Sequence, residues 1–215
     1  MKFDKLIELL KRVELLEFIE KLPLNLDMIV GEKGGKLSRK ERGLESFKKC
    51  ADAIAKIAAK YPEKKGLILP FTDDIETGIV EALKDNHPLV YARLRQHSKM
   101  PKERDAVFRE FEDEQNNEIL ISTYANQGFD GKMVGFTVIA KVPFGPLGDI
   151  QVKSKAENDP KWYQMMTAVE LAQMAGRCVR SSSDVGHTYI IDPSFMFHFE
   201  RGMKNNPLAR VLPPY

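Results

Sequence analysis

Short apolar runs separated by amphipathic stretches are the feature that most limits how this chain can fold. The runs have the length of strands, and the segments between them are long enough for helices of about 10 to 20 residues. Strands that alternate with helices form right-handed βαβ units, which assemble into a parallel sheet with helices on both faces. The sequence therefore predicts an α/β fold. The predicted strands are 66–71, 88–93, 118–123, 135–144 and 186–192.

Several of the predicted helices have a recognisable first turn. Asp73 is an acidic residue in the first turn of one helix, and Pro101 opens another, where its missing N–H costs nothing. Asp159 and Pro160 are of the types preferred at the N-cap and at the first position of a helix. Amphipathic spacing predicts the remaining helices. The predicted helices are 3–21, 41–60, 73–84, 101–111 and 160–180.

Length and composition favour one globular domain. The chain has 215 residues, of which 43% are hydrophobic and 30% are charged. Its net charge is only +2, so any contact with nucleic acid must come from a local basic patch. We expect three parts. They are a helical N-terminal segment packed on the domain (1–64), the α/β domain (65–200) and an extended C-terminal tail (201–215).

Cysteine and apolar content bear on compartment and cofactors. Cys50 and Cys178 are far apart and lie in apolar helical patterns, so we expect no disulfide, and two thiols cannot hold an iron–sulfur cluster. The histidines show no metal-ligand spacing, so no metal site is expected in this chain. No apolar run approaches the ~20 residues of a membrane span. We expect an intracellular protein without a membrane partner.

The segment LAQMAGRCVR, residues 171–180, combines polar and apolar faces on one predicted helix. With about 100° of rotation per residue, Gln173, Gly176, Arg177 and Arg180 share one face, while apolar residues fill the other. A glycine inside a helix costs about 1 kcal/mol relative to alanine. A solvated face gains nothing from that cost, whereas a surface that a ligand approaches closely does. Guanidinium groups bind phosphate oxygens well, so the pattern favours phosphate recognition over a merely solvated face.

Three ordered motifs resemble those of a known family. QMAGRCVR resembles the sixth motif, Q-x-x-G-R-x-x-R, of superfamily 2 helicases, most closely the group typified by XPD and the bacterial DinG proteins. The segment from ILISTYANQGFDG to the following PF resembles the fifth motif, and GLILPFT resembles the fourth. The resemblance covers about residues 65–200. It implies the second RecA-like domain of such a motor, which is a parallel sheet with helices on both faces.

The resemblance also implies roles for individual residues. It assigns the contacts to the γ-phosphate and its attacking water to the sixth motif. It assigns to the fifth motif the contacts with the DNA phosphates and the coupling between the DNA site and the nucleotide site. One departure is Gln127, which stands where this group usually has Glu. The implied catalytic residues are Arg177, Arg180 and Gln173; the implied nucleotide-binding residues are Gly128, Asp130 and Gly176; Thr123 is implied to bind DNA.

A basic stretch follows the predicted strand 88–93. It contains Arg93, Arg95, His97, Lys99, Lys102 and Arg104. Such stretches are common on solvated surfaces. Because non-specific strand binding depends on phosphate neutralisation, we expect Arg93, Arg95 and Lys99 to contact single-stranded DNA.

The chain lacks the phosphate loop of a complete motor. The required pattern is G-x-x-x-x-G-K-[ST], and the nearest approach, GEKGGKLS at 31–38, has the wrong spacing and no hydroxyl after its lysine. We therefore expect a P-loop NTPase fold without its own phosphate loop. ATP and Mg²⁺ would be held mainly by a first RecA-like domain, in cis or in trans. Any iron–sulfur cluster would also belong to that missing portion.

Two functional readings follow. The first is the second motor domain of a 5′ to 3′ ATP-dependent DNA helicase acting in repair or replication, inactive without the first domain. The alternative is a stand-alone non-catalytic module that keeps the fold and binds nucleic acid or protein. An unrelated phosphate-binding α/β protein would require the ordered motifs to be accidental.

Overall fold

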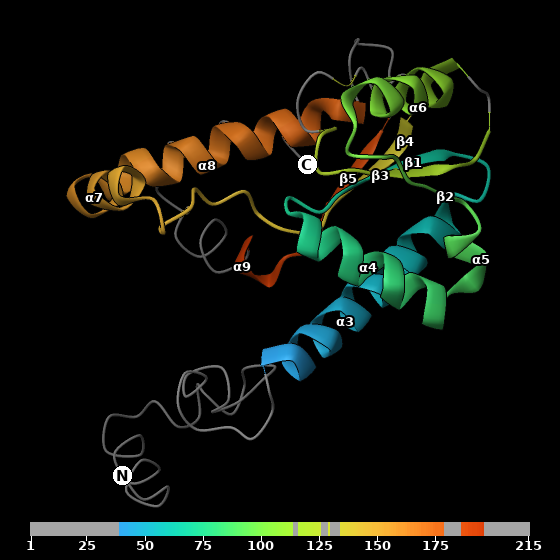
Figure 1. Ribbon diagram of the computed structural model, residues 1–215, viewed down its shortest axis with the longest axis horizontal. Coiled ribbons are helices and arrows are strands. Elements are labelled where there is room, and N and C mark those ends of the chain that lie inside the picture. The colour runs from blue at the N-terminus through green and yellow to red at the C-terminus, as the bar shows by residue number, and fades with distance from the viewer. Residues whose placement is uncertain (1–38, 114–115, 126–128, 130–133, 179–185, 196–215) are drawn as a thin grey trace, which may run out of the picture. The chain divides into compact units, whose positions relative to one another are not determined.

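A five-stranded sheet in which all strands are parallel forms the centre of the fold, with the order β2-β3-β1-β4-β5 (Figure 1). The strands are β1 (Lys65–Leu69), β2 (Leu94–Arg95), β3 (Ile119–Ile121), β4 (Val134–Ile139) and β5 (His187–Ile190). The computed structural model describes residues 39–113, 116–125, 129, 134–178 and 186–195. The chain divides into two units, Met1–Gly43 and Leu44–Tyr215, and the fold described here is that of the second.

Helices cover both faces of the sheet, as the sequence predicts. The crossover from β1 to β2 runs in one direction along the sheet, whereas those from β2 to β3 and from β4 to β5 run in the other. Because parallel crossovers are right-handed, opposite directions place the helices on opposite faces. One face carries α3 (Arg39–Lys60), α4 (Asp73–Asn86) and α5 (Pro88–Tyr91), and the other carries α6 (Pro101–Asp113) and α8 (Pro160–Ala175) (Figure 1). The predicted α/β fold class is confirmed.

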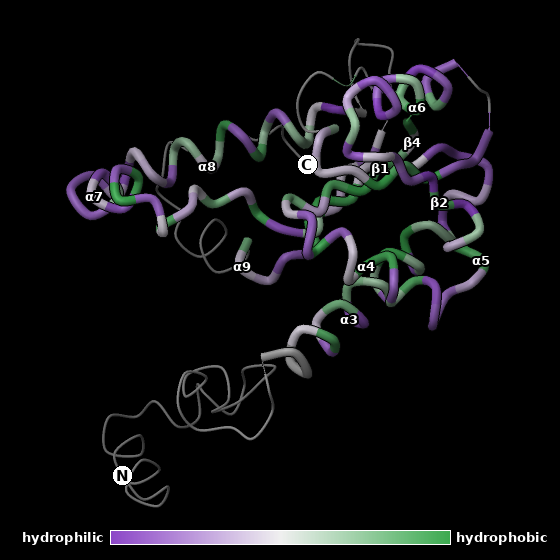
Figure 2. The backbone as a smooth tube through the Cα atoms, in the orientation of Figure 1, coloured by the Kyte–Doolittle hydropathy of each residue, from purple (hydrophilic) through white to green (hydrophobic). Residues whose placement is uncertain are grey.

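Two apolar clusters hold these layers together. Within β1, Ile68 packs with α3 and α4, while Leu67 and Leu69 pack with α6 and α8. This alternation follows from the two-residue period of a strand, and it leaves all five residues of β1 buried. Figure 2 shows hydrophobic colouring along the sheet and hydrophilic colouring along much of α7 (Ile150–Asn158). Each face of the sheet therefore has its own hydrophobic core.

Only the second half of α8 packs into the hydrophobic core on the face that carries α6 and α8. Leu171 and Met174 are buried against the sheet, whereas Met165 and Met166 are about half exposed, at 47% and 51%. Asp159 caps the helix as predicted, accepting a hydrogen bond from the main-chain N of Trp162. The sequence did not predict α7, nor the short helix α9 (Pro193–Phe195).

The prediction of a strand over 88–93 is wrong, because Pro88–Tyr91 forms the short helix α5. Proline has no N–H to pair in a sheet, and its fixed φ suits the first turn of a helix. Leu89 is 85% exposed, so the apolar run that suggested a buried strand is not buried. The strand β2 begins later, at Leu94.

The predicted end of the helix 160–180 is also wrong. The α-helix ends at Ala175, and Gly176–Cys178 forms the 3-10 turn η2. Gly176 has φ −74° and ψ 0°, so it lies at the C-cap and not in the middle of a helix. Its low helix propensity accounts for the early end.

Several predicted elements lie outside the described residues, including the helix 3–21 and the tail 201–215. The division into segments 1–64, 65–200 and 201–215 stays a prediction. In the parts of the chain that the structure describes, no helix is long and apolar enough to cross a membrane.

Candidate functional site

Two loops leave the sheet side by side where β1 and β3 end. The loop after β1 contains Phe71, whose φ of 78° is unusual for a residue with a side chain. Thr72 follows as the N-cap of α4, and its hydroxyl accepts a hydrogen bond from the main-chain N of Ile75. The loop after β3 carries Thr123. Ligands of open α/β sheets bind outside the carboxyl ends of the strands, so this edge is a candidate site.

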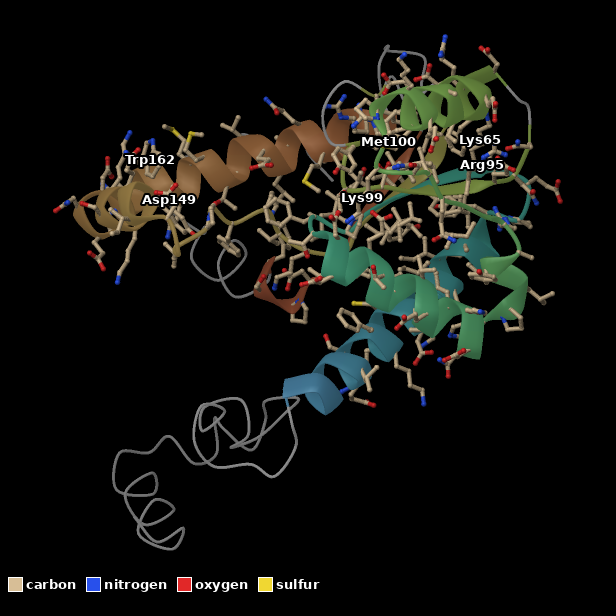
Figure 3. The ribbon with its side chains drawn as sticks, viewed as in Figure 1. Lys65, Arg95, Lys99, Met100, Asp149 and Trp162 are labelled. Atoms are coloured by element: carbon tan, nitrogen blue, oxygen red, sulfur yellow. The ribbon has the colours of Figure 1, made fainter. Side chains whose placement is uncertain are left out.

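Thr123 is bound twice to the first turn of α4. Its main-chain N donates to Oε2 of Glu76 at 3.1 Å, and its Oγ1 donates to Oδ1 of Asp73 at 3.1 Å. The other oxygen of Asp73 accepts a hydrogen bond from Nζ of Lys99, which lies beside this turn (Figure 3). Two of the residues predicted to bind DNA, Thr123 and Lys99, are thus brought together through one carboxylate.

The pKa values of the two carboxylates that contact Thr123 are shifted in opposite directions. The hydrogen bonds from Lys99 and Thr123 hold the pKa of Asp73 below its ordinary value. Burial raises the pKa of Glu76, although the hydrogen bond from the main chain of Thr123 opposes that rise. The sequence indicates Asp73 only as part of the first turn of a helix, and Glu76 is not among the predicted site residues. The signal that could have found them is an acidic turn directly after a buried strand.

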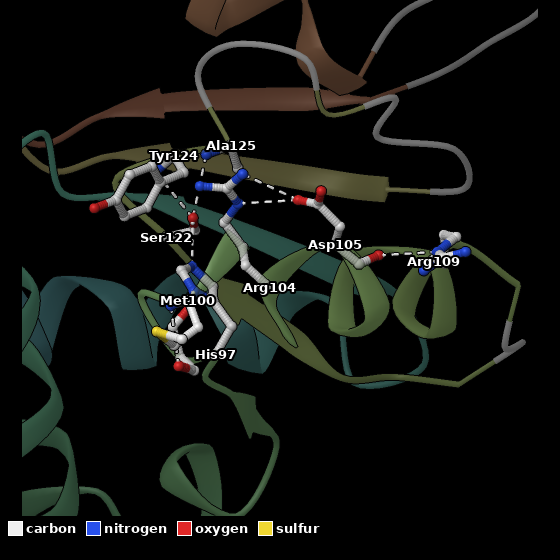
Figure 4. A network of polar contacts seen from close by, with 9 residues as sticks. His97, Met100, Arg104, Asp105, Arg109, Ser122, Tyr124 and Ala125 are labelled. Atoms are coloured by element: carbon white, nitrogen blue, oxygen red, sulfur yellow. Dashed lines mark hydrogen bonds and ion pairs between the residues drawn. The ribbon is translucent and has the colours of Figure 1, made fainter. Parts of the chain in front are cut away.

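His97, in the loop after the neighbouring strand β2, contacts the same loop (Figure 4). Its Nε2 lies 2.7 Å from Oγ of Ser122, and its Nδ1 lies 2.8 Å from the carbonyl oxygen of Ser98. The buried Ser122 hydroxyl also accepts hydrogen bonds from the main-chain N of Tyr124, at 3.0 Å, and of Ala125, at 3.2 Å. This network fixes the turn that presents Thr123.

Arg93 and Arg95, which were predicted to bind DNA, make other contacts in the structure. Arg93 precedes β2 and donates to main-chain carbonyl oxygens, whereas Arg95 pairs with Glu110 and Glu118. The acceptors of Arg93 are the carbonyl oxygens of Ala58 (3.3 Å), Tyr61 (3.1 Å), Lys64 (2.9 Å) and Asn117 (2.8 Å). Arg93 therefore ties the segments that enter β1 and β3, and DNA contact by either arginine stays a prediction.

Arg177 lies near the end of the sheet where the strands begin, opposite to Thr123. The helix α8 runs back toward the start of β5, and Thr188 in that strand donates a hydrogen bond to the carbonyl oxygen of Ala175 at 3.0 Å. Nη1 of Arg177 donates to the carbonyl oxygen of Phe129 at 3.0 Å. This bond joins the segment that resembles the sixth motif to the one that resembles the fifth.

The other predicted nucleotide and catalytic residues are only partly described. Gln173 is exposed on α8. Among the described residues, no atom lies within 4 Å of a Cβ added at Gly176, apart from its chain neighbours and its own helix backbone. Arg180, Gly128 and Asp130 lie outside the described residues. Their roles in nucleotide binding and catalysis stay predictions.

Within the described ranges, no group of three or more His, Cys, Asp or Glu residues could hold a metal ion. The buried Asp192, which follows β5, accepts hydrogen bonds within the chain. Burial opposes its ionisation, but hydrogen bonds from the main-chain N of Val142 and Ser194 and from Lys141 bring its pKa below the ordinary value. Asp192 thereby links the loops after β4 and β5.

Comparison with solved structures gives similar folds at low sequence identity. A structure described as XPD helicase is 19% identical, with a TM-score of 0.51, and the match covers 74% of this chain and 30% of that one. The structure of S. tokodaii Xpd4 is 13% identical, with a TM-score of 0.52, and the match covers 79% of this chain and 34% of that one. The chain thus spans about a third of these relatives, which share its RecA-like fold.

No curated protein matches the chain. The family model of the helicase C-terminal domain matches residues 39–205, which is most of the chain. The expected resemblance to a helicase C-terminal domain is confirmed by this match, and the expected RecA-like fold is shared with the two XPD structures. The chain belongs to the helicase C-terminal domain family.

Proposed function

We propose that this chain is the second motor domain of an ATP-dependent DNA helicase that moves 5′ to 3′ on single-stranded DNA in repair or replication. The observation that carries the proposal is the hydrogen bond from Arg177 to the carbonyl oxygen of Phe129. It joins the two segments to which the family resemblance assigns nucleotide contact. Gly128 and Asp130 flank Phe129 in sequence.

In this proposal the chain contributes cationic groups to a phosphate that another domain holds. Mg²⁺-bound ATP on the first RecA-like domain would supply the γ-phosphoryl group that is transferred to water. A half-buried guanidinium with a fixed main-chain partner suits this role, because pre-positioned charge stabilises the developing charge without reorganisation. Arg177 and Arg180 would act as the arginine fingers, and the exposed Gln173 would orient water or phosphate.

The DNA track would lie at the carboxyl edge of the sheet. Thr123 and Lys99 are hydrogen-bonded to the same carboxylate, so both side chains reach a single anionic group. Hydroxyl and ammonium donors of this kind bind backbone phosphates without reading bases. This arrangement supports strand binding that is independent of sequence.

The decisive test is reconstitution of ATPase activity with an amino-terminal RecA-like domain that carries the phosphate loop. We expect single-stranded DNA to stimulate ATP hydrolysis by the pair, and Arg177→Ala or Arg180→Ala to reduce turnover by about 10³-fold. The matched control is Arg109→Ala on α6, because Arg109 is bonded to the main chain of its own helix. Thermal melting of each variant checks that the fold is kept.

Two results would overturn the proposal. One is substantial ATPase activity by the reconstituted pair when both arginines are replaced. The other is robust ATPase activity by this chain alone. DNA binding that is unchanged by loss of both arginines, with no ATPase activity restored by any first domain, would instead support a stand-alone binding module.

A further inference from the structure

Asp73 is hydrogen-bonded to Thr123 and Lys99, the two side chains that contact a DNA phosphate in the proposed function. Oδ1 of Asp73 accepts from Oγ1 of Thr123 at 3.1 Å, and Oδ2 accepts from Nζ of Lys99. A carboxylate and a phosphate diester both present anionic oxygens to such donors. The pair of contacts made by Asp73 is therefore the pair that a backbone phosphate would make.

These contacts exclude a phosphate for a simple chemical reason. A hydroxyl group has one hydrogen to donate, so Thr123 cannot donate to a phosphate while it donates to Asp73. Lys99 keeps further N–H donors, but the adjacent carboxylate cancels its charge. The negative charge of Asp73 would also repel an approaching phosphate.

The surroundings allow an exchange of partners. The side chains of Lys99 and Asp73 are 70% and 46% exposed, and ion pairs of this kind are weak. The main chain of Thr123 is held separately, since its N–H donates to the half-buried Glu76. The Thr123 hydroxyl can therefore turn toward a new acceptor without displacement of the loop.

We infer that Asp73 occupies, in the free protein, the place of a DNA backbone phosphate on Thr123 and Lys99, and that single-stranded DNA must displace it to bind. This inference rests on the proposed function and adds a competing anion to the same site. The carboxylate lowers the affinity of the domain for any strand. It also supplies a partner to which Thr123 and Lys99 return when the strand leaves.

The test is the affinity of the chain for a fluorescein-labelled oligothymidylate of about 20 nucleotides, measured by fluorescence anisotropy at low salt. Asp73→Ala should bind about fivefold more tightly than the unchanged protein, which corresponds to the upper range for an exposed ion pair. Asp73→Asn keeps an acceptor for Thr123 but loses the charge, so its gain should be smaller. Both gains should shrink at high salt, where the charges are screened.

The matched control is Asp74→Ala. It removes the same charge from the same turn of α4 but leaves the contacts of Asp73 in place, so its gain should be less than about twofold. In the double variant Asp73→Ala/Lys99→Ala, the gain from losing Asp73 should fall, because the cation it neutralised is gone. Thermal melting of all variants verifies folding.

The possible outcomes distinguish a failure of this inference from a failure of the proposed function. If Thr123→Ala and Lys99→Ala leave DNA affinity unchanged, the proposed DNA track is wrong and the inference fails with it. If both substitutions weaken binding but Asp73→Ala gains no more than Asp74→Ala, the track stands and the inference alone is overturned. A gain specific to Asp73 and dependent on Lys99 supports it.

Discussion

Arg93 and Lys99, both in the basic stretch 93–104, lie at opposite ends of the parallel strands and have different kinds of partner. Arg93 stands before β2, at the edge where the parallel strands begin, and binds carbonyl oxygens of the main chain. Lys99 stands after β2, at the edge where the strands end, and binds an exposed carboxylate. One short strand therefore divides a stretch that is continuous in sequence into a structural part and an exchangeable part.

The two arrangements differ in whether the partner of the cation can be replaced by another group. Main-chain carbonyl groups cannot leave their places, and Arg93 satisfies four of them close to the start of β1 and β3. The carboxylate of Asp73 is on an exposed first turn and can be replaced by another anion. Positive charge in a sequence is thus a poor guide to phosphate binding until its partners are known.

The largest effect that tests this comparison is expected for Arg93→Ala. Loss of the guanidinium leaves several carbonyl groups without their donor, so the free energy of unfolding should fall by about 2–3 kcal/mol. Arg93→Lys should recover little of it, because an ammonium group lacks the planar fork. Urea unfolding followed by circular dichroism measures both. A loss below about 0.5 kcal/mol for Arg93→Ala would remove the structural part of the comparison.

A smaller loss of stability is expected for Ser122→Ala at the opposite edge. The buried hydroxyl accepts two main-chain N–H bonds and contacts His97, so its removal should lower the free energy of unfolding by about 1–2 kcal/mol. Ser98→Ala is the control, since its Oγ accepts an exposed bond from the main chain of Met100. The same urea titration compares them. Equal losses would mean that the network around Ser122 is not specially stabilising.

Lys99→Ala should separate binding from stability. Its exposed ion pair contributes little, so the free energy of unfolding should change by less than about 1 kcal/mol. Affinity for single-stranded DNA should fall about fivefold, and the slope of log affinity against log salt should fall by about one. Anisotropy titrations over several salt concentrations measure this slope. An unchanged slope would exclude a phosphate contact by Lys99.

The smallest effect concerns the ionisation of the two acids that hold Thr123. In Lys99→Ala the pKa of Asp73 should rise toward its ordinary 3.8, while that of Glu76, raised mainly by burial, should change little. NMR titration of the side-chain carboxyl carbons measures both. A pKa of Asp73 that is the same in both proteins would contradict the ion pair.

The two shifts have opposite consequences for stability. Because the pKa of Asp73 is lowered on folding, its contribution is present above pH 3.8 and is lost as the pH falls through the folded value. Because that of Glu76 is raised, its contribution is present below pH 4.5 and is lost as the pH rises through the folded value.

The central sheet could be predicted from the sequence because burial selects apolar runs of strand length. The run at 66–71 overlaps β1 and the run at 118–123 contains β3, and both strands are buried throughout. The run at 88–93 misled because a proline begins it and its leucine is exposed. Apolar content alone does not reveal which local backbone a run adopts.

The site could be predicted only in part, because its contacts join distant segments. Separate sequence patterns indicate Thr123 and Lys99, and the sequence indicates Asp73, which joins them, only as the start of a helix. The acceptors of Arg93 are carbonyl groups, which carry no side-chain signature in the sequence. Pairing of this kind becomes visible only when the sheet order sets which loops are neighbours.

Among the described residues, none would meet a methyl group added at Gly176, so a substitution there can show whether a partner approaches it. Its φ and ψ are accessible to alanine, and no described atom would meet the added methyl group. An alanine at 176 should therefore leave folding unchanged, to be checked by thermal melting. A loss of ATPase activity in an assembled motor, with folding unchanged, would then indicate that a surface outside the described residues lies close to Gly176. One methyl group would measure how closely a partner approaches.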